Sequence, residues 1–304
     1  MSLIKKIMSA IRTYPFFLVF WLLSLQVGLA QTLEGLQKEF EAASEVTQKI
    51  ALLQHMSQLA HAQQSDQALA YAQEALDWST RYHLHPSTIQ ARLQLASILL
   101  EQKAHDEAEA HLKATRQLLD EQTSSVAEVQ YAITLGKFHT KKRNPQKTIE
   151  VLQSSYRNHS EVADSLKRAL LVVLTKAYQR QRDWDMVEKY LKERLKLKAS
   201  LDSVVVYNKW GTIYAQQQLY NQALPYYEKS LASATQINDS KGKSRAILNI
   251  GNIHLINGKW ELAITYYQRS ATLKEQLGDE RGLATLHNNI AAIYKDQKRY
   301  KESI

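Results

Sequence analysis

The sequence contains no cysteine. Disulfide bonds, cysteine-bound zinc, iron–sulfur clusters, thiol catalysis and a lipid-modified cysteine are therefore excluded. Proline and glycine are also scarce, with four and nine residues among 304. Because these residue types break helices and mark turns, their scarcity suits a protein that is helical almost throughout. The lack of cysteine does not decide the compartment, since an exported protein need not form disulfides.

Catalytic motifs are missing as well. The sequence has no Walker-type phosphate loop, no GxGxxG and no GxSxG, so nucleotide binding and acyl transfer have no motif. Close histidine pairs such as His55 with His61 and His83 with His85 do not have the HExxH spacing of a zinc site. We predict no metal, no cofactor and no enzymatic activity. The alternative, an enzyme on a helical body, requires a pocket with converging titratable groups.

Charges of both signs are interspersed along the chain. Lys and Arg number 39 and Asp and Glu number 30, which gives a formal net charge of +9. A solvated surface accounts for this pattern better than a nucleic-acid or lipid surface, so we predict no nucleic-acid partner. Hydrophobic residues make up 44% of the chain, which is enough to bury a core.

The N-terminal 30 residues have the layout of a secretory signal peptide. Lys5, Lys6 and Arg12 precede an apolar run over residues 16–27. Small residues follow, with Gly28 at position −3 and Ala30 at position −1 of a candidate cleavage site. The run is shorter than the roughly 20 apolar residues of a membrane span. We therefore expect residues 1–30 to be a signal peptide and the protein to be exported, to the periplasm or outside the cell.

An uncleaved N-terminal anchor is the alternative reading of the same segment. Residues 11–30 could cross a thin bilayer, and the positive flank lies before the apolar run. In that case the rest of the chain is anchored to the membrane and faces outside, because positive flanks remain in the cytoplasm.

A repeat of about 40 residues is clearest after position 200. The segment that begins at Tyr207 returns 40 residues later, and again after another 40. Its matching columns are Gly211, Gly251 and Ala291; Tyr214, His254 and Tyr294; Tyr220, Trp260 and Tyr300; and Ala223, Ala263 and Ser303. A period of this size indicates an array of helical hairpins.

The same columns extend back toward the N-terminus. Trp184 falls in the Tyr220 column, Gly136 in the Gly211 column, and Ala108 and Ala68 in the Ala223 column. The inferred repeats start near residues 49, 89, 129, 168, 204, 244 and 284. Residues 49–304 therefore hold about seven repeats, of which the last is incomplete. Over residues 49–128 the spacing carries the assignment, and a generic helical bundle is the alternative there.

Turn residues support these boundaries. Asn144 before Pro145 predicts a helix start, and Gly278 before Asp279 predicts a helix end followed by a new cap. Asn221 is a second candidate cap, and Pro225 follows it near the first turn.

Residues 31–48 are predicted to form a capping helix for the array. Leu33, Leu36, Phe40 and Ala43 share one helical face in this segment. The end of a stack of repeats needs such a cover for its apolar surface.

The columns resemble the tetratricopeptide repeat (TPR) family, which places Leu-Gly and Tyr on a first helix and Ala with an aromatic residue on a second. The resemblance implies an all-α fold, a right-handed superhelical solenoid of antiparallel helix pairs. The period exceeds the common 34 residues, and in this respect the chain resembles the peptide-binding arrays of kinesin light chains and of bacterial peptide-sensing regulators.

The resemblance also implies that the first helix of each repeat lines a concave groove. The polar residues expected to face it are Lys137, Lys141, Lys176, Arg180, Asn208, Lys209, Arg245, Asn249, Asn252, Asn288 and Asn289. Thr212 and Lys295 fall on the same faces. Asn is a poor residue for a helix interior, so its recurrence there calls for a reason.

An amide side chain can donate to and accept from a peptide backbone at the same time. The cations among these residues favour an acidic segment or a free carboxylate. The full carboxylate clamp of the family is not reproduced, which leaves a C-terminal carboxylate ligand in doubt. The alternative is that these side chains are only the solvated polar face of the array.

We therefore predict a non-catalytic scaffold that binds a protein or peptide, an acidic one being favoured. The alternative is the extracytoplasmic sensor region of a longer signalling protein of the histidine kinase or transcription regulator type, since the chain stops at Ile304 within an unfinished hairpin. Membrane contact is expected only if residues 11–30 stay uncleaved or the chain continues past 304 into a span.

Overall fold

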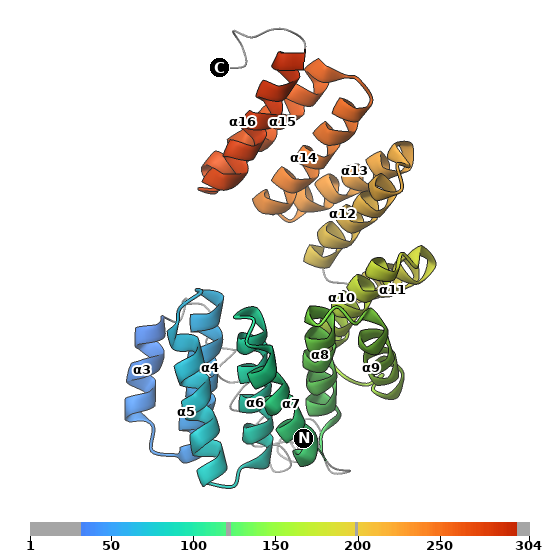
Figure 1. Cartoon of the computed structure of the whole chain (residues 1–304). Helices are drawn as coiled ribbons and strands as arrows, with labels where there is room; N and C mark the ends of the chain where they lie inside the picture. Colours follow the sequence, from blue (N-terminus) through green and yellow to red (C-terminus); the bar gives the residue numbers. More distant parts are fainter. Residues whose placement is uncertain (1–31, 120–122, 198–199, 297–304) are drawn as a thin grey trace, which may run out of the picture. The chain divides into compact units, whose positions relative to one another are not determined.

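The computed structural model describes residues 32–119, 123–197 and 200–296. Within these ranges the secondary structure consists of fourteen α-helices and no strand (Figure 1). The proposed signal segment, residues 1–30, lies outside the described residues, as does the end of the last repeat.

The helices alternate as first and second members of hairpins, after an initial helix α3 (Leu33–Ala42). The first members are α4 (Val46–Ala62), α6 (His85–Glu101), α8 (Ser125–Lys141), α10 (Asp164–Gln181), α12 (Ser200–Gln216), α14 (Ser240–Ile256) and α16 (Glu280–Asp296). The second members are α5 (Gln67–Arg81), α7 (His105–Leu118), α9 (Pro145–Asn158), α11 (Trp184–Lys196), α13 (Tyr220–Gln236) and α15 (Trp260–Gln276). The first members begin three or four residues before the repeat starts read from the columns.

The chain divides into two compact units, which are described separately. Unit 1 extends to Leu166 and contains α3 to α9, while unit 2 begins at Lys167 and contains α10 to α16. The boundary falls in the first turn of α10.

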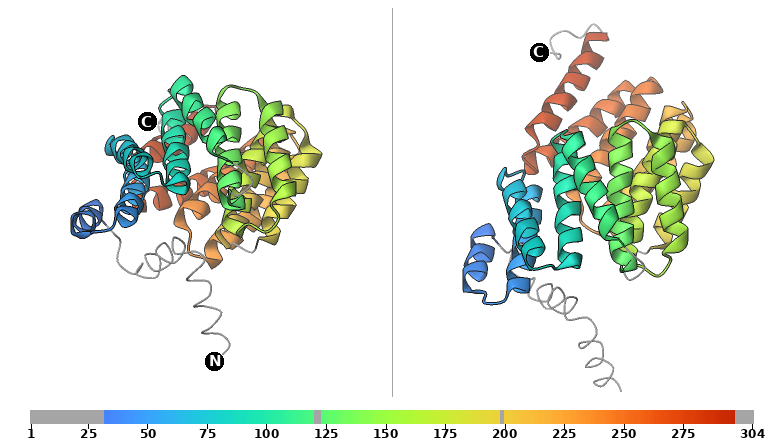
Figure 2. Two further views of the ribbon diagram at one scale, coloured as in Figure 1. Left: turned by 90° about the horizontal axis from the view of Figure 1, so that it is seen from below. Right: turned by 60° about the horizontal axis from the view of Figure 1, so that its bottom comes forward.

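Consecutive helices pack as antiparallel pairs in both units. In unit 1, α4 packs on α5, α6 on α7 and α8 on α9, and the neighbouring first helices α4, α6 and α8 also touch (Figures 1 and 2). In unit 2, α12 packs on α13 and α14 on α15, and α12 also touches α14. The predicted all-α array of antiparallel helix pairs is confirmed.

Helix α3 covers the open side of the first hairpin. Leu36 is fully buried against this hairpin, and Leu33 and Phe40 pack beside it. The Lys49 ammonium lies 5.2 Å from the centre of the Phe40 ring and 5.6 Å from the centre of the Trp78 ring. It forms a cation–π interaction with each ring. Thr32 caps the helix by accepting a hydrogen bond from the Gly35 amide at 3.1 Å. The apolar face read from the sequence is thus the face that packs.

A glycine on the first helix admits a large side chain from the second. A Cβ atom on Gly211 would lie 2.6 Å from the Tyr227 ring, and one on Gly251 would lie 2.8 Å from the Tyr267 ring. Real Cβ atoms do not approach so closely, and Tyr267 is fully buried. The glycine column therefore sets how near the two helices of a hairpin can come.

A hydroxyl group makes a second link within these hairpins. Ser230 Oγ on α13 donates to the Val204 carbonyl at 2.8 Å, and Ser270 Oγ on α15 donates to the Ser244 carbonyl at 2.9 Å. Both serines are fully buried. The two bonds join residues 26 apart, so they occupy equivalent positions in consecutive repeats.

Several helices end with a residue in the left-handed conformation. Gly258 and Gly278 do so, with φ of 71° and 65°. Larger residues do the same after other helices, namely Gln64, His83, Lys103, Arg143, Arg182, Gln218 and Asn238. At Gln218 the Leu219 amide donates to the Tyr214 carbonyl at 2.9 Å, which satisfies a carbonyl at the end of α12.

The predicted helix starts are borne out at two of three places. Asn144 accepts a hydrogen bond from the Lys147 amide at 3.1 Å, and Asp279 accepts one from the Gly282 amide at 2.9 Å. The cap predicted at Asn221 is wrong, because α13 already begins at Tyr220 and Leu219 precedes it. Pro225 stays inside that helix, near its start, where the loss of one backbone hydrogen bond is tolerated.

We predict that Gly251→Ala destabilises the fold by about 1–3 kcal/mol, because the added methyl group overpacks the contact with Tyr267. Urea denaturation followed by circular dichroism measures the change. The control is Gly35→Ala in α3, where a Cβ would meet only Thr32 Oγ1 at 3.4 Å. That substitution should stabilise by up to about 1 kcal/mol through helix propensity. Equal effects of the two substitutions would contradict the packing role of the glycine column.

Candidate functional site

The predicted groove residues of unit 1 are Lys137 and Lys141, and both are exposed on α8. The neighbouring first helices carry amides that the sequence reasoning missed. Gln94 Nε2 on α6 donates to the Gln54 carbonyl on α4 at 3.0 Å, and Gln54 Nε2 donates to the Ser87 carbonyl at 3.1 Å. Gln54 and Gln94 are 40 residues apart, so the repeat spacing was the signal that could have revealed them.

In unit 2 the structure brings two of the predicted asparagines together. Asn249 Nδ2 on α14 donates to Asn208 Oδ1 on α12 at 2.9 Å. Both side chains are partly buried, and they join consecutive first helices. The bond uses one donor and one acceptor of the pair, so each amide keeps further hydrogen-bonding capacity.

Asn252 has a structural partner of its own. Its Oδ1 accepts a hydrogen bond from the Tyr267 hydroxyl at 2.8 Å. In the preceding repeat the Tyr227 hydroxyl lies 3.4 Å from Thr212 Oγ1, at the equivalent place. Asn252 therefore satisfies the buried tyrosine of its own hairpin, and this bond uses one of the two lone pairs of its amide oxygen.

The remaining predicted residues of unit 2 differ in exposure. Those that are exposed are Lys176 and Arg180 on α10, Arg245 on α14 and Asn288 on α16. Asn289 on α16 is partly buried. Their side chains are therefore accessible to different degrees along the first-helix face of the unit.

Lys209 is half-buried on α12, and its electrostatic environment is positive. Burial lowers the pKa of Lys209, and the charges of Lys176 and Arg194 lower it further. Two of the predicted cations, Lys176 and Lys209, thus lie within electrostatic range of each other. Arg194, on the second helix α11, was not predicted to belong to this surface.

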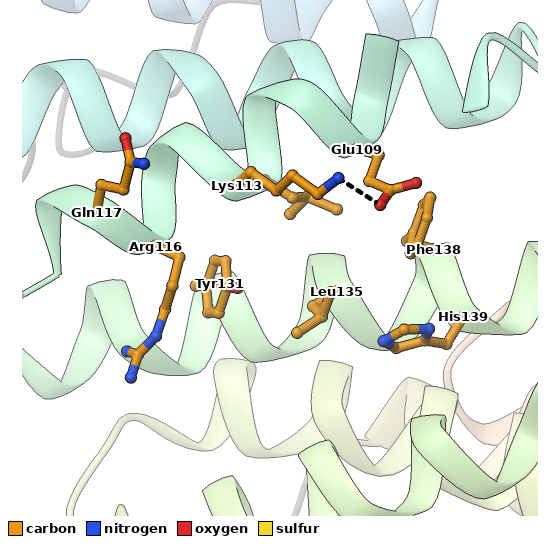
Figure 3. Close-up of a pocket in the computed structure, with 9 residues that line it drawn as sticks. Glu109, Lys113, Arg116, Gln117, Tyr131, Leu135, Phe138 and His139 are labelled. Atoms are coloured by element: carbon orange, nitrogen blue, oxygen red, sulfur yellow. Dashed lines mark ion pairs between the residues drawn. The ribbon is translucent and has the colours of Figure 1, made fainter. Parts of the chain in front are cut away.

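Unit 1 has an open groove between α7 and α8, with a volume of about 440 Å³ (Figure 3). Its apolar lining includes Tyr131 and Leu135, which lie between the two helices in Figure 3. Glu109 and Lys113 lie along its α7 edge and form an ion pair of 2.9 Å. The complete lining is Glu109, Leu112, Lys113, Arg116, Gln117, Tyr131, Leu135, Phe138 and His139.

The groove has a sequence cause. Glu109 occupies a position at which other repeats carry an aliphatic residue, namely Leu69, Ile149, Leu224 and Ile264. Leu69, Leu224 and Ile264 pack against buried residues of the following repeat. Leu69, for example, contacts the core clusters of both the first and the second repeat. Glu188 is the other exception, and it pairs with Lys192 at 2.7 Å beside a second groove of about 380 Å³. At Glu109, a charged pair in place of an aliphatic residue thus leaves the junction between α7 and α8 open, whereas the groove beside Glu188 is lined by α11 alone.

Chemistry beyond binding has little support in the described ranges. In these ranges no group of three or more histidines and carboxylates is arranged to hold a metal ion. The shortest histidine–carboxylate contact in these ranges joins His159 Nε2 to Glu128 Oε2 at 2.9 Å, and His61 Nε2 lies 3.3 Å from the exposed Glu101 Oε2. Across the same residues, no helix has the length and apolar character needed to cross a membrane.

We predict that Glu109→Leu raises the melting temperature by about 2 °C, because the leucine closes the groove as Leu69 does in the first repeat. Differential scanning calorimetry measures the shift. Glu74→Leu is the matched control, since Glu74 is an exposed residue of α5. If Glu74→Leu stabilises the protein as much as Glu109→Leu, the aliphatic position is not what closes the junction.

His139, on the α8 side of the groove, should make stability depend on pH (Figure 3). Burial, followed by the charge of Lys147, lowers the pKa of His139 below its ordinary value. The unfolded chain therefore takes up a proton near pH 6.5 while the folded chain does so only at lower pH. We expect the free energy of unfolding to fall between pH 7.5 and pH 5, and to fall less in His139→Gln. Urea titrations at both pH values test this, and an unchanged pH dependence in the variant would refute it.

Family models of the tetratricopeptide repeat match residues 58–121, 169–203, 202–276 and 242–304. A search of curated proteins found no match.

Solved structures show the same fold at low sequence identity. The apo form of RapI is 13% identical, with a TM-score of 0.71 over 85% of this chain and 73% of RapI. The quorum sensor NprR from B. thuringiensis is 13% identical, with a TM-score of 0.55 over 89% of this chain and 88% of NprR. A signal transduction ATPase from Pyrococcus horikoshii with a tetratricopeptide repeat sensor is 14% identical, with a TM-score of 0.59 over 83% of this chain and 42% of that protein.

The repeat columns, the antiparallel hairpins and the family matches agree. The chain belongs to the tetratricopeptide repeat proteins.

Proposed function

We propose that this protein is a non-catalytic scaffold that binds an extended protein or peptide segment along the first-helix face of unit 2. Proteins built from tetratricopeptide repeats generally act as interaction scaffolds rather than enzymes. The observation that carries the proposal is the contact between Asn208 and Asn249, which holds two amides side by side on consecutive first helices.

The amide pair suits a peptide backbone. Each primary amide has two N–H donors and an oxygen with two lone pairs, and the mutual bond uses only one of each. The other groups can bond to the carbonyls and amides of an extended segment without reading its side chains. Holding the two amides together beforehand also reduces the ordering cost of binding.

The charges around the amides favour an acidic ligand. Lys176, Arg180 and Arg245 are exposed on the first helices of unit 2, and the half-buried Lys209 lies within electrostatic range of Lys176. Such a surface attracts an anionic segment over distance and then pairs with its carboxylates. Lys137 and Lys141 belong to unit 1 and are not needed for this proposal.

A sensory role is the second candidate. Two proteins with this fold are described as a quorum sensor and as a signalling ATPase with a repeat sensor. By analogy, the binding surface of the present chain would detect a peptide or protein and report it to an output domain. We place the protein outside the cytoplasm in either role, on the basis of the signal-like residues 1–30.

The test is a ligand selection against the purified chain. A random peptide library is panned, and the selected peptides are measured by isothermal titration calorimetry. We expect Asn249→Ala combined with Asn288→Ala to weaken the selected peptides about tenfold or more, because each lost hydrogen bond contributes on the order of 1 kcal/mol.

The matched control combines Gln222→Ala with Gln268→Ala, two exposed amides on the second helices α13 and α15. It should leave the affinity unchanged, and thermal melts should show both variants folded. Peptides that bind the asparagine variant as tightly as the parent protein would exclude the first-helix face as the binding surface.

A further inference from the structure

Arg194 interrupts a column of small residues. Arg194 lies 26 residues after Arg168. The same interval separates Ser230 and Ser270 from the residues whose carbonyls they bond, so Arg194 occupies the equivalent position in the fourth repeat. The earlier repeats carry Ala75, Thr115 and Ser155 at this position. Only the fourth repeat places a long cation there, and its side chain is 6% exposed.

Asp202 is the partner that makes this substitution possible. It stands 40 and 80 residues before Gly242 and Gly282, so here too a charged residue replaces small ones. Arg194 on α11 forms an ion pair with Asp202 at the start of α12, and both are buried. A buried charge without a partner would be strongly destabilising, so the two replacements depend on each other.

One carboxylate is shared among several cations at this place. Arg168 on α10 has its Nε 3.7 Å from Asp202 Oδ2. Lys209 follows Asp202 by seven residues, two helical turns later on the same face of α12. Lys176 follows Arg168 by eight residues on α10. Two arginines therefore lie close to Asp202. The two lysines lie further along α10 and α12, and we call the line between these two helices the α10–α12 seam.

The seam between α10 and α12 is closed beyond the lysines. Gln179 Nε2 on α10 donates to Gln216 Oε1 on α12 at 3.0 Å. Asp202, Lys209 and Gln216 are spaced by seven residues, so they form one stripe along α12. Lys209 thus lies between a charged contact at one end of the seam and an amide contact at the other.

The charged neighbours of the half-buried Lys209 are like charges. Within the described residues, the charged groups that shift the pKa of Lys209 are Lys176 and Arg194, both cations. The nearby acids of α11 have other partners, since Glu188 pairs with Lys192 at 2.7 Å and Glu193 with Lys196 at 2.7 Å. A half-buried ammonium beside like charges is stabilised most by an anion supplied from outside.

We propose that the α10–α12 seam is an anion site that takes one carboxylate side chain of an acidic peptide, held between Lys176 and Lys209. The charge of the buried Arg194 adds to the positive potential at Lys209. The inference rests on the proposed function, because it names the point at which an acidic ligand of unit 2 is anchored.

The chemistry of the seam favours a carboxylate over a phosphate group. Arg194, whose planar fork could bind a phosphate with two hydrogen bonds, is buried and already pairs with Asp202, and Arg168 lies 3.7 Å from the same carboxylate. The groups that remain for a ligand are the two ammonium ions, which act as point charges. A carboxylate placed between the two ammonium ions attracts both and so reduces their mutual repulsion.

The test uses two synthetic probes, N-acetylated and C-amidated hexaglutamate and hexaglutamine, titrated into the full chain at low salt. We expect hexaglutamate to bind and hexaglutamine not to bind. Lys176→Gln combined with Lys209→Gln should weaken hexaglutamate about tenfold or more, by loss of two charge-assisted contacts. The matched control, Lys137→Gln combined with Lys141→Gln, removes the same charge from exposed lysines of unit 1 and should change the affinity less than twofold.

Three outcomes would overturn the anion site: no binding of hexaglutamate, equal binding of hexaglutamine, or equal losses in the two lysine variants. A melting temperature below that of the parent protein in the seam variant would also count against it, because removing like charges should leave stability equal or higher. These failures are separate from failure of the proposed function. Peptides selected by panning would still depend on Asn249 and Asn288 if only the anion site were wrong.

Discussion

The close approach of the two helices in each hairpin is the contact on which the structure depends. In the fifth and sixth repeats, a glycine of the first helix faces a tyrosine ring of the second, and no Cβ atom would fit between them. Gly136 meets Leu152 in the same way, with 2.9 Å to an added Cβ. Once this distance is set, the hydroxyls of Ser230 and Ser270 reach the facing backbone and the tyrosine hydroxyls reach Thr212 and Asn252. Polar residues of the first helix are thereby held by the same packing that forms the core.

Residues that depart from the repeat pattern produce the features that distinguish single repeats of this chain, namely the open grooves and a buried ion pair. Glu109 and Glu188 replace aliphatic residues that elsewhere join consecutive repeats, and an open groove lies beside each. Arg194 and Asp202 replace small residues and place a buried ion pair beside Lys209. A repeat can tolerate such exceptions because each hairpin contacts mainly its neighbours, so that a local change is not transmitted through one common core.

Much of the fold could be read from the sequence because a 40-residue period repeats the same packing contacts. Gly211, Gly251, Ala223 and Ala263 mark the crossings of the helices, and the structure places all four in buried positions. Helix ends were harder to predict. The turns after α4, α6 and α12 use Gln64, Lys103 and Gln218 in the left-handed conformation. These turns could not be predicted from the sequence, because glycine is the usual residue in that conformation. The cap predicted at Asn221 was wrong because α13 already begins at Tyr220, so Asn221 lies inside the helix.

The sequence by itself determined the class of fold, the period and the set of polar residues on the first helices, because these depend on local patterns that recur along the chain. Only the tertiary structure decided which of those residues meet. It paired Asn249 with Asn208, committed Asn252 to Tyr267, placed Arg194 near Lys209 and divided the array into two units at the start of α10. The physical reason is that hydrogen bonds and charge interactions act over a few ångströms between side chains that are 15 to 41 residues apart in the sequence. Such pairings depend on the distance between packed helices, which no single repeat specifies alone.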